Sequence, residues 1–417
     1  MINVEVVSQH AEDAAFLWFA RDRAVRAPHY DLKDLARLDE RVEANIDGLR
    51  VAGSTGWDLA AEAMKQAGPG ELFTAAVLAF ETRDTKRIDL VLNIAAKSDS
   101  LARAVVSALG WMLFDDAKPI LESLSRSGRA ELRRVAIAGY AVHRVNPGEP
   151  LRQAVADVDS WLQNRAFKTA AELGRCDLAY TIVRSISSDD ETSRFYAAWS
   201  AARLGIHDRD IIDVLRRTAD AGGPHAEPAL DITLRCLRLD ESHSWLSAML
   251  KDPKRQRFGI VGVGVVGDPA RVSELIGYMQ IEQLSRVAGE AFSMITGVDF
   301  KHVDLDRPKP EQFEAGPSDD PNEADVAMDK DEDLPWPAPE LVRKWWDKHQ
   351  HEFHLGVRYL RGKPIEPKAL IDALKNGYQR QRAAAALELA LFRPSDVIFE
   401  VRAPGTRQNK ALAQWTS

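Results

Sequence analysis

Residues 134–146 read RVAIAGYAVHRVN, and both ends of this stretch recur along the chain. Arg134 precedes a run of small and apolar residues, and a short polar residue, Asn146, follows it. A side chain of this kind suits a helix N-cap, because its oxygen accepts a hydrogen bond from an otherwise unpaired backbone N–H. We therefore interpret the stretch as a first helix followed by the start of a second helix.

The polar position recurs at a nearly constant interval. Its members are Asp84, Asp115, Asn146, Asp177, Asp208, Asp240 and Asp268, with gaps of 31, 31, 31, 31, 32 and 28 residues, and one more step of 31 reaches Asp299. The arginine position recurs out of phase with it, at Arg103, Arg134, Arg165, Arg194, Arg257 and Arg286. This spacing predicts about seven helix–turn–helix units of roughly 31 residues between Glu71 and Gly297.

A helical pair of this size cannot bury its apolar face alone, so the pairs are expected to stack into a right-handed α-solenoid. Alternation with a period of two residues is nearly absent, and Ala, Leu, Arg and Glu dominate, which disfavours strands. The predicted fold class is all-α, an α-solenoid of HEAT-like helical repeats over residues 70–300.

The segments on either side of the repeats differ from them in composition. Residues 1–69 hold two amphipathic helices around a turn at Pro28 and are predicted to form an N-terminal helical cap. Residues 301–340 are predicted to be a flexible, acidic, Pro-rich linker, since 304–340 contain 13 acids, 3 bases and seven prolines. Alternatively, this acidic segment masks a basic surface. Residues 341–417, with 14 bases and 7 acids, are predicted to form a C-terminal basic helical region that docks on the linker or faces an acidic partner. Within it, residues 381–392 are predicted to form another first helix, and residues 394–396 to cap the helix that follows.

The composition of the 417 residues, with a net charge of −8, argues against several classes of protein. A nucleic-acid coat needs a basic face, which an acidic total disfavours. The longest nearly apolar run, residues 258–267, is about half of the ~20 residues that a membrane-spanning helix needs. The first residues lack the basic and apolar regions of a signal peptide, and two cysteines make no disulfide framework. We therefore expect a cytoplasmic location.

Two motifs suggest chemistry that their context does not favour. Residues 262–267 spell GxGxxG, but Arg257 and Asp268 occupy the repeat positions around them, which favours the end of a first helix over a dinucleotide site. The histidines around His351 lack HExxH spacing, so a solvated or partner-facing helix is favoured over a metal site. We expect no enzymatic activity, no cofactor and no metal.

Three stretches of the chain carry a resemblance to a known family. They are VVSQHAEDAAFLWFARDRAVRAPHYDLKDLARLDERVEANIDGLRVAG at 6–53, VVGDPARVSELIGYM at 265–279 and VAGEAFSMITG at 287–297. Together they resemble an uncharacterised bacterial family of HEAT-like repeat proteins. Genes of that family are often found in type VI secretion clusters, beside genes for spike-tip and effector-loading proteins. The resemblance implies an accessory role in loading or maturing a secreted effector, with no catalytic residues to carry over.

The leading functional hypothesis is a non-enzymatic protein-binding scaffold. It would be an adaptor or chaperone whose concave surface, lined by the second helices, holds a type VI secretion effector or spike-tip protein. The alternatives are an immunity protein that occludes a toxin, and a HEAT-like DNA glycosylase or nucleic-acid binder. No membrane, nucleic acid or small-molecule cofactor is expected as a partner. Residue types enriched in binding hot spots select the candidate contacts Arg21, His29, Tyr30, Trp345, Trp346 and His351.

Overall fold

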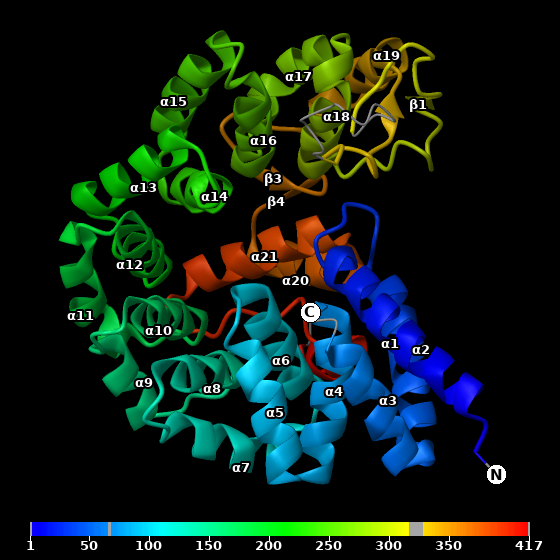
Figure 1. Ribbon diagram of the computed structural model, residues 1–417. Helices are drawn as coiled ribbons and strands as arrows, with labels where there is room; N and C mark the ends of the chain where they lie inside the picture. The colour runs from blue at the N-terminus through cyan, green and yellow to red at the C-terminus, as the bar shows by residue number, and fades with distance from the viewer. Residues whose placement is uncertain (1, 66–67, 317–327, 416–417) are drawn as a thin grey trace, which may run out of the picture. The chain divides into compact units, whose positions relative to one another are not determined.

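The computed structural model describes residues 2–65, 68–316 and 328–415, which are mostly α-helical (Figure 1). The prediction of an all-α fold is confirmed, since these residues form 22 α-helices and only two pairs of two-residue strands. The strand pairs are antiparallel and join β1 (Asp306–Arg307) to β2 (Trp336–Pro337) and β3 (Tyr359–Leu360) to β4 (Lys363–Pro364).

The helices form four groups, of which the second and third alternate along the chain. The N-terminal group is α1 (Val4–Ala24), α2 (Leu32–Ala52) and α3 (Ser54–Met64). The even-numbered helices that follow, here called the first helices, are α4 (Pro69–Thr82), α6 (Asp99–Trp111), α8 (Ala130–Val142), α10 (Ser160–Glu172), α12 (Glu191–Arg203), α14 (Ala226–Cys236), α16 (Gln256–Val266) and α18 (Glu282–Thr296). The odd-numbered helices between them, here called the second helices, are α5 (Thr85–Ala95), α7 (Phe114–Ser125), α9 (Glu149–Val155), α11 (Ala179–Val183), α13 (Arg209–Ala221), α15 (Leu239–Lys251) and α17 (Val272–Tyr278). The C-terminal group is α19 (Pro339–His349), α20 (Pro367–Asn376), α21 (Gln379–Phe392) and α22 (Gly405–Ala413).

The chain forms two compact units. The first contains residues up to 26, residues 30–218 and residues from 389 onward, and the second contains residues 27–29 and 219–388. This division differs from the four segments that composition predicts. The basic C-terminal region is divided between the units, because its last part packs on helices of the first unit while α19 packs on α17 of the second.

Within each unit, the first helices pack on one another in chain order. In the first unit α4 contacts α6, α6 contacts α8, α8 contacts α10 and α10 contacts α12, and in the second unit α14 contacts α16 and α16 contacts α18. Small residues permit this packing, since a Cβ at Gly264 of α16 would lie 3.1 Å from the Cα of Ala291 in α18. The GxGxxG motif thus lies in α16 and its C-cap, Gly267, as predicted.

The polar positions lie at or near the starts of second helices, but their local role varies. Asp84 and Asp268 act as N-caps, as predicted, and accept hydrogen bonds from backbone N–H groups. Asp115 and Asp240 instead lie inside the first turns of α7 and α15, and Asn146 lies two residues before the N-cap of α9. The predicted N-cap role is wrong at these three positions and at Asp177, which lies inside the short 3-10 helix Cys176–Leu178 before α11. For the three aspartates the reason is that an acidic side chain is also favourable inside the first turn of a helix.

Two long helices, α1 and α2, flank the turn at Pro28, as predicted. Asp31 begins α2 with a capping box, in which its side chain and that of Asp34 each accept a hydrogen bond from the other's backbone N–H. Trp18 joins α1 to the first helices, because its ring stacks on Phe73 of α4 with centroids 5.0 Å apart. The indole N–H of Trp18 also donates to Ser107 of α6 at 3.0 Å.

The described ends of the predicted acidic linker belong to the second unit and contact its helices α16 and α18. Asp331 accepts two hydrogen bonds from Arg257, at 2.6 and 2.7 Å, and Asp329 accepts one from Arg286 at 2.7 Å. The guanidinium of Arg286 also lies 4.6 Å from the ring centroid of Trp336. Residues 317–327, the centre of the predicted linker, lie outside the described residues. Two of the described acids therefore pair with members of the arginine series.

Candidate functional site

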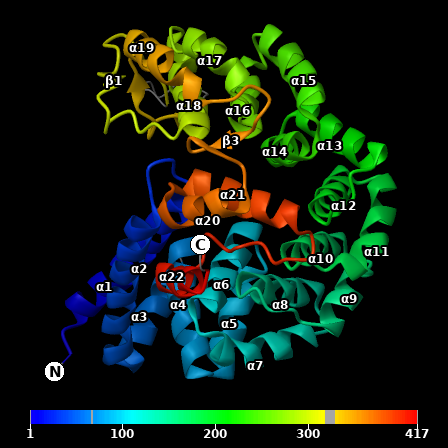
Figure 2. The same cartoon turned by 180° about the vertical axis from the view of Figure 1, so that it is seen from behind.

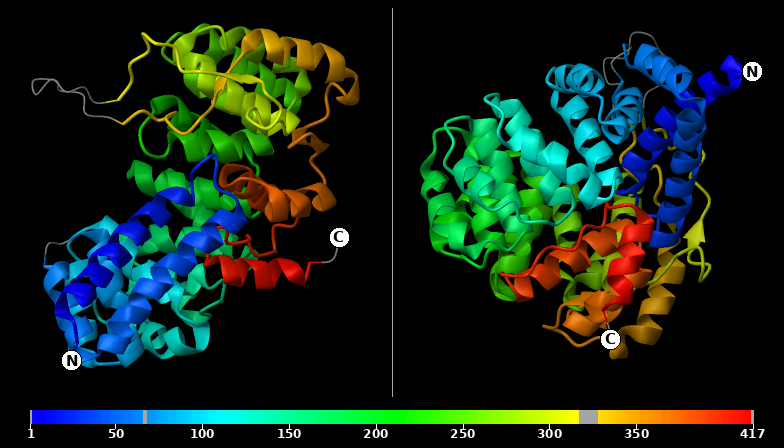
Figure 3. Two further views of the ribbon diagram at one scale, coloured as in Figure 1. Left: turned by 90° about the vertical axis from the view of Figure 1, so that its right-hand side faces the viewer. Right: turned by 90° about the horizontal axis from the view of Figure 1, so that it is seen from below.

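In the first unit, residues 393–404 form a segment without regular secondary structure between α21 and α22. The sequence predicts a further helix capped at 394–396, and this prediction is wrong. The segment instead lies along the carboxyl ends of the first helices and passes them in reverse chain order, from α12 to α6 (Figure 2, Figure 3).

The contacts of the segment begin at α12. Arg203 is fully buried and donates from Nη1 to the carbonyl oxygen of Pro394 at 3.0 Å, and from Nη2 to the carbonyl oxygen of Asp396. Burial lowers the pKa of Arg203 to about 10. At the end of α10, the carbonyl oxygen of Glu172 accepts a hydrogen bond from the backbone N–H of Ile398 at 2.9 Å. Main-chain groups of the segment thus pair with groups at two successive helix ends.

A buried cluster of charges holds the middle of the segment. The carboxylate of Glu400 forms ion pairs with Arg144 at 2.9 Å and with Arg402 at 2.8 Å. The carboxylate of Glu172 is paired with Arg165 and lies 3.7 Å from Arg144. Burial alone would raise the pKa of Glu172, but the charges of Arg165 and Arg144 outweigh it and lower this pKa to about 2. For Glu400, too, burial would raise the pKa, but the charges of Arg144 and Arg402 outweigh it and lower the pKa, so both carboxylates stay ionised.

The segment ends in α22, where Arg407 contacts α6. Its Nη2 donates to the carbonyl oxygens of Gly110 and Met112, both at 2.8 Å, and its Nη1 lies 3.4 Å from Nδ1 of His143. Nε2 of His143 lies 2.9 Å from the carbonyl oxygen of Leu109, which accepts its proton. Burial, and then the charge of Arg407, lowers the pKa of His143 to about 4. His143 is therefore neutral, with its proton on Nε2 and Nδ1 free to accept from Arg407.

This histidine makes stability depend on pH. Because the pKa of His143 is about 4 in the native protein and about 6.5 in the unfolded chain, the unfolded chain alone binds a proton between these values. Stability should thus fall as the pH falls, with this site accounting for about 2 kcal/mol between pH 6.5 and 4.5. Urea unfolding of wild type and His143→Gln at both pH values tests this. The glutamine variant should lose about 2 kcal/mol less than wild type, and equal losses would contradict the assignment.

In the second unit, a non-helical segment likewise lies on the carboxyl end of a first helix, α16. The backbone N–H of Tyr359, in β3, donates to the carbonyl oxygen of Gly267 at 2.8 Å. The neighbouring Arg358 donates from Nε to the carbonyl oxygen of Val266 at 2.9 Å and from Nη2 to the carboxylate of Glu388. In both units, chain from the C-terminal region thus binds the ends of first helices. The sequence hypothesis placed the binding surface on the second helices instead.

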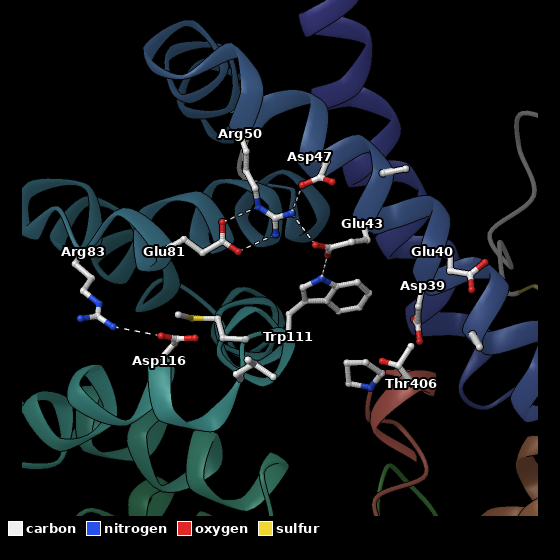
Figure 4. A pocket seen from close by; sticks show the side chains of 15 residues that line it. Asp39, Glu40, Glu43, Asp47, Arg50, Glu81, Arg83, Trp111, Asp116 and Thr406 are labelled. Carbon is white, nitrogen blue, oxygen red and sulfur yellow. Dashed lines mark hydrogen bonds and ion pairs between the residues drawn. The ribbon is translucent and has the colours of Figure 1, made fainter. Parts of the chain in front are cut away.

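A cavity of about 720 Å³ lies in the first unit between α2, the carboxyl end of α4, the α6–α7 turn and the start of α22 (Figure 4). Six acids and two arginines line it. Trp111 and Leu113 form its apolar surface, here called the apolar ledge, and the exposed fraction of Leu113 is 72%. The charged residues are Asp39, Glu40, Glu43, Asp47, Glu81, Asp116, Arg50 and Arg83. Acids outnumber arginines, so the cavity favours a cationic ligand.

Arg50 organises one wall of the cavity (Figure 4). It donates to Glu43 at 2.6 Å, to Asp47 at 2.7 Å and to both carboxylate oxygens of Glu81 at 2.7 and 2.8 Å. The hydrogen bond with Glu81 is the largest of the effects that raise the pKa of Arg50 above its ordinary value. The indole N–H of Trp111 donates to Glu43 at 2.5 Å, which ties the apolar ledge to this wall.

Glu40 differs from the other acids of the cavity. Its side chain is exposed, and among the described residues no hydrogen bond or ion pair engages its carboxylate. Asp116 is paired only weakly, with Arg83 at 3.4 Å, and both of these side chains are more than half exposed. Glu40 and Asp116 are therefore the carboxylates of the cavity that are most available to a ligand.

The six candidate residues from the sequence do not form one site. Arg21 is buried rather than exposed, because it pairs with Asp39 at 2.6 Å and donates to the carbonyl oxygen of Arg402 at 2.8 Å. Trp346 is also buried, with its ring 6.4 Å from that of Phe292. Both therefore hold the fold together.

The other four candidates differ in exposure and belong to different units. His29 and His351 are exposed, while Tyr30 and Trp345 are partly buried. Tyr30 belongs to the first unit, and His29, Trp345 and His351 belong to the second. Sequence reasoning did not find Glu40, Trp111 or Leu113, which lie in a turn or on a helix face without a recognisable motif.

Among the described residues, no helix combines the length and the apolar character that crossing a membrane requires. No model of a known protein family matches the sequence, and no curated protein matches it.

Proposed function

We propose that the protein is a non-enzymatic scaffold, built as an α-solenoid of HEAT-like repeats, that binds a partner protein along the carboxyl ends of its first helices. The chain-order packing of the first helices supports the solenoid, since each helix contacts the next but one in the chain. One observation carries the binding role. In each unit, a non-helical segment of the chain already lies on these helix ends.

The chemistry of helix ends explains why they bind such segments. The last carbonyl groups of a helix have no partner within it, and together they carry a partial negative charge. An extended segment supplies backbone N–H groups, as Ile398 does to Glu172, and arginine side chains, as Arg358 does to Val266. A segment of another protein with the same groups would satisfy them equally well.

The cavity at α4 is the part of this row that remains open in the first unit. The resemblance described above suggests a secreted effector or a spike-tip protein of a type VI secretion system as the partner. The protein would then act as an adaptor or chaperone that holds a segment of this cargo. This partner class is part of the proposal.

A pull-down with the full chain tests the proposal. The bait is the tagged protein, and the candidates are effector and spike-tip proteins of a type VI secretion system, captured at low salt. Wild type should retain one of them, and Glu40→Lys should reduce capture by about tenfold by reversing a charge in the cavity. Asp58→Lys is the matched control, because Asp58 is an exposed acid on α3 outside the cavity. Failure of wild type to retain a candidate, or equal capture by Glu40→Lys, would contradict the proposal.

A further inference from the structure

The cavity occupies the next position in a row of helix ends. The C-terminal segment covers the ends of α12, α10, α8 and α6 in that order. The next first helix along the row is α4, which packs on α6. Its last turn and C-cap contribute Glu81 and Arg83 to the cavity lining. The end of α4 is thus exposed to a ligand where the preceding ends are covered by the chain itself.

The covered ends show which group fits there. At α6, the guanidinium of Arg407 bridges the carbonyl oxygens of Gly110 and Met112. At α16 in the second unit, Arg358 binds the carbonyl oxygen of Val266 together with the carboxylate of Glu388. Two guanidinium groups from different parts of the chain therefore each bind carbonyl oxygens at the end of a first helix. At α16 a carboxylate also accepts a hydrogen bond from the same guanidinium.

The cavity offers the same kinds of group, a helix end and carboxylates, and its lining includes no arginine of the C-terminal segment. Asp116 offers a carboxylate near the end of α4, where the helix dipole also favours a cation, and Glu40 offers one on α2 at the opposite end of the cavity (Figure 4). Leu113, which is exposed, and Trp111 provide apolar surface against which the methylene groups of a long side chain can pack. A planar guanidinium can bind carboxylate and carbonyl oxygens at once, which the compact ammonium of lysine does less well.

We infer that this cavity binds the guanidinium group of an arginine carried by an extended segment of the partner protein. The inference rests on the proposed function, because it names the chemistry of the segment that the scaffold receives. The arginine enters beside α4 as the next guanidinium in the row after Arg407. Its carboxylate partner is Asp116, and Glu40 at the opposite end of the cavity receives a second arginine of the same extended segment.

Short peptides test the inference on the full chain. The probes are Ac-Ala-Arg-Ala-Arg-Ala-NH2 and its lysine and citrulline counterparts, each with a fluorescent label, titrated by fluorescence anisotropy at low and high salt. The arginine peptide should bind at least about fivefold more tightly than the lysine peptide, and the neutral citrulline peptide should bind most weakly. Glu40→Gln with Asp116→Asn should weaken the arginine peptide by about tenfold, whereas Asp58→Asn should leave it unchanged.

The outcomes separate this inference from the proposed function. Equal affinities for the arginine and lysine peptides, no binding of the arginine peptide to wild type, or no effect of the cavity variants would overturn the inference. If the pull-down still retained a partner in a Glu40-dependent manner, the scaffold role would stand and only the arginine preference would fall. If wild type captured no partner, the proposed function would itself fall, whatever the peptides do.

Discussion

Replacing Glu400 by glutamine is expected to destabilise the first unit by about 3 kcal/mol. Glu400 has a side-chain exposure of 7%, and it neutralises Arg144, which is also mostly buried, and Arg402, which is partly exposed. Glutamine retains the volume of the side chain but removes the negative charge. Arg144 then remains buried without its main counter-charge, which is the costly way to break a buried ion pair.

Urea denaturation followed by circular dichroism measures this loss. The matched control is Glu62→Gln on α3, because Glu62 pairs with Lys65 and both side chains are about 70% exposed. Removing an exposed pair of this kind should change stability by less than about 0.5 kcal/mol. If Glu400→Gln were as stable as this control, the C-terminal segment would not be held by the charge cluster.

Replacing Gly267 by alanine should destabilise the second unit by about 3 kcal/mol. Gly267 follows α16 with φ of +75°, and a Cβ there would lie 2.3 Å from the carbonyl oxygen of Tyr359. The left-handed backbone alone costs about 1 to 2 kcal/mol for alanine. The remainder comes from displacing β3, whose N–H at Tyr359 donates to Gly267 itself.

Gly222→Ala is the matched control for this substitution. Gly222 directly follows α13 in the second unit with φ of +80°, but no atom lies within 4 Å of the position that an added Cβ would take. It should therefore show only the backbone cost of about 1 to 2 kcal/mol in urea unfolding. Equal losses for the two variants would mean that the segment around β3 does not lie on the end of α16.

The helices were largely predictable from sequence, because their signals are local. The arginine series lies in first helices as expected, from Arg103 in α6 to Arg286 in α18. The exact N-caps were not predictable at every position. Asp115 shows why, since an aspartate inside the first turn is favoured by the same helix dipole that favours an acidic cap.

The segment on the helix ends was not predictable by the same means. It joins Glu400 to Arg144 and Ile398 to Glu172 across more than 200 residues, and neither pair belongs to a periodic pattern. The sequence nevertheless contains one local signal of this contact. Gly174 and Gly205 stand 31 residues apart at the ends of first helices, and both have positive φ and approach the C-terminal segment closely.

The same limit applies to the cavity. Its lining comes from helices and turns that are distant in sequence, and Glu40 and Leu113 carry no motif of their own. The sequence-based candidates were chosen by residue type, which does not distinguish an arginine at a surface from one like Arg21, which pairs with a buried acid. Tertiary packing decides this difference.

Hydrogen exchange of residues 396–405 tests the central claim most directly. The backbone N–H of Ile398 donates to the carbonyl oxygen of Glu172, and that of Gly405 donates to the carboxylate of Asp39 at 2.6 Å. Although most of this segment is not helical, we expect these two amides to exchange at least about 100-fold more slowly than in an unstructured peptide. Exchange at the rate of an unstructured peptide would show that the segment does not occupy the helix ends, and would contradict the account.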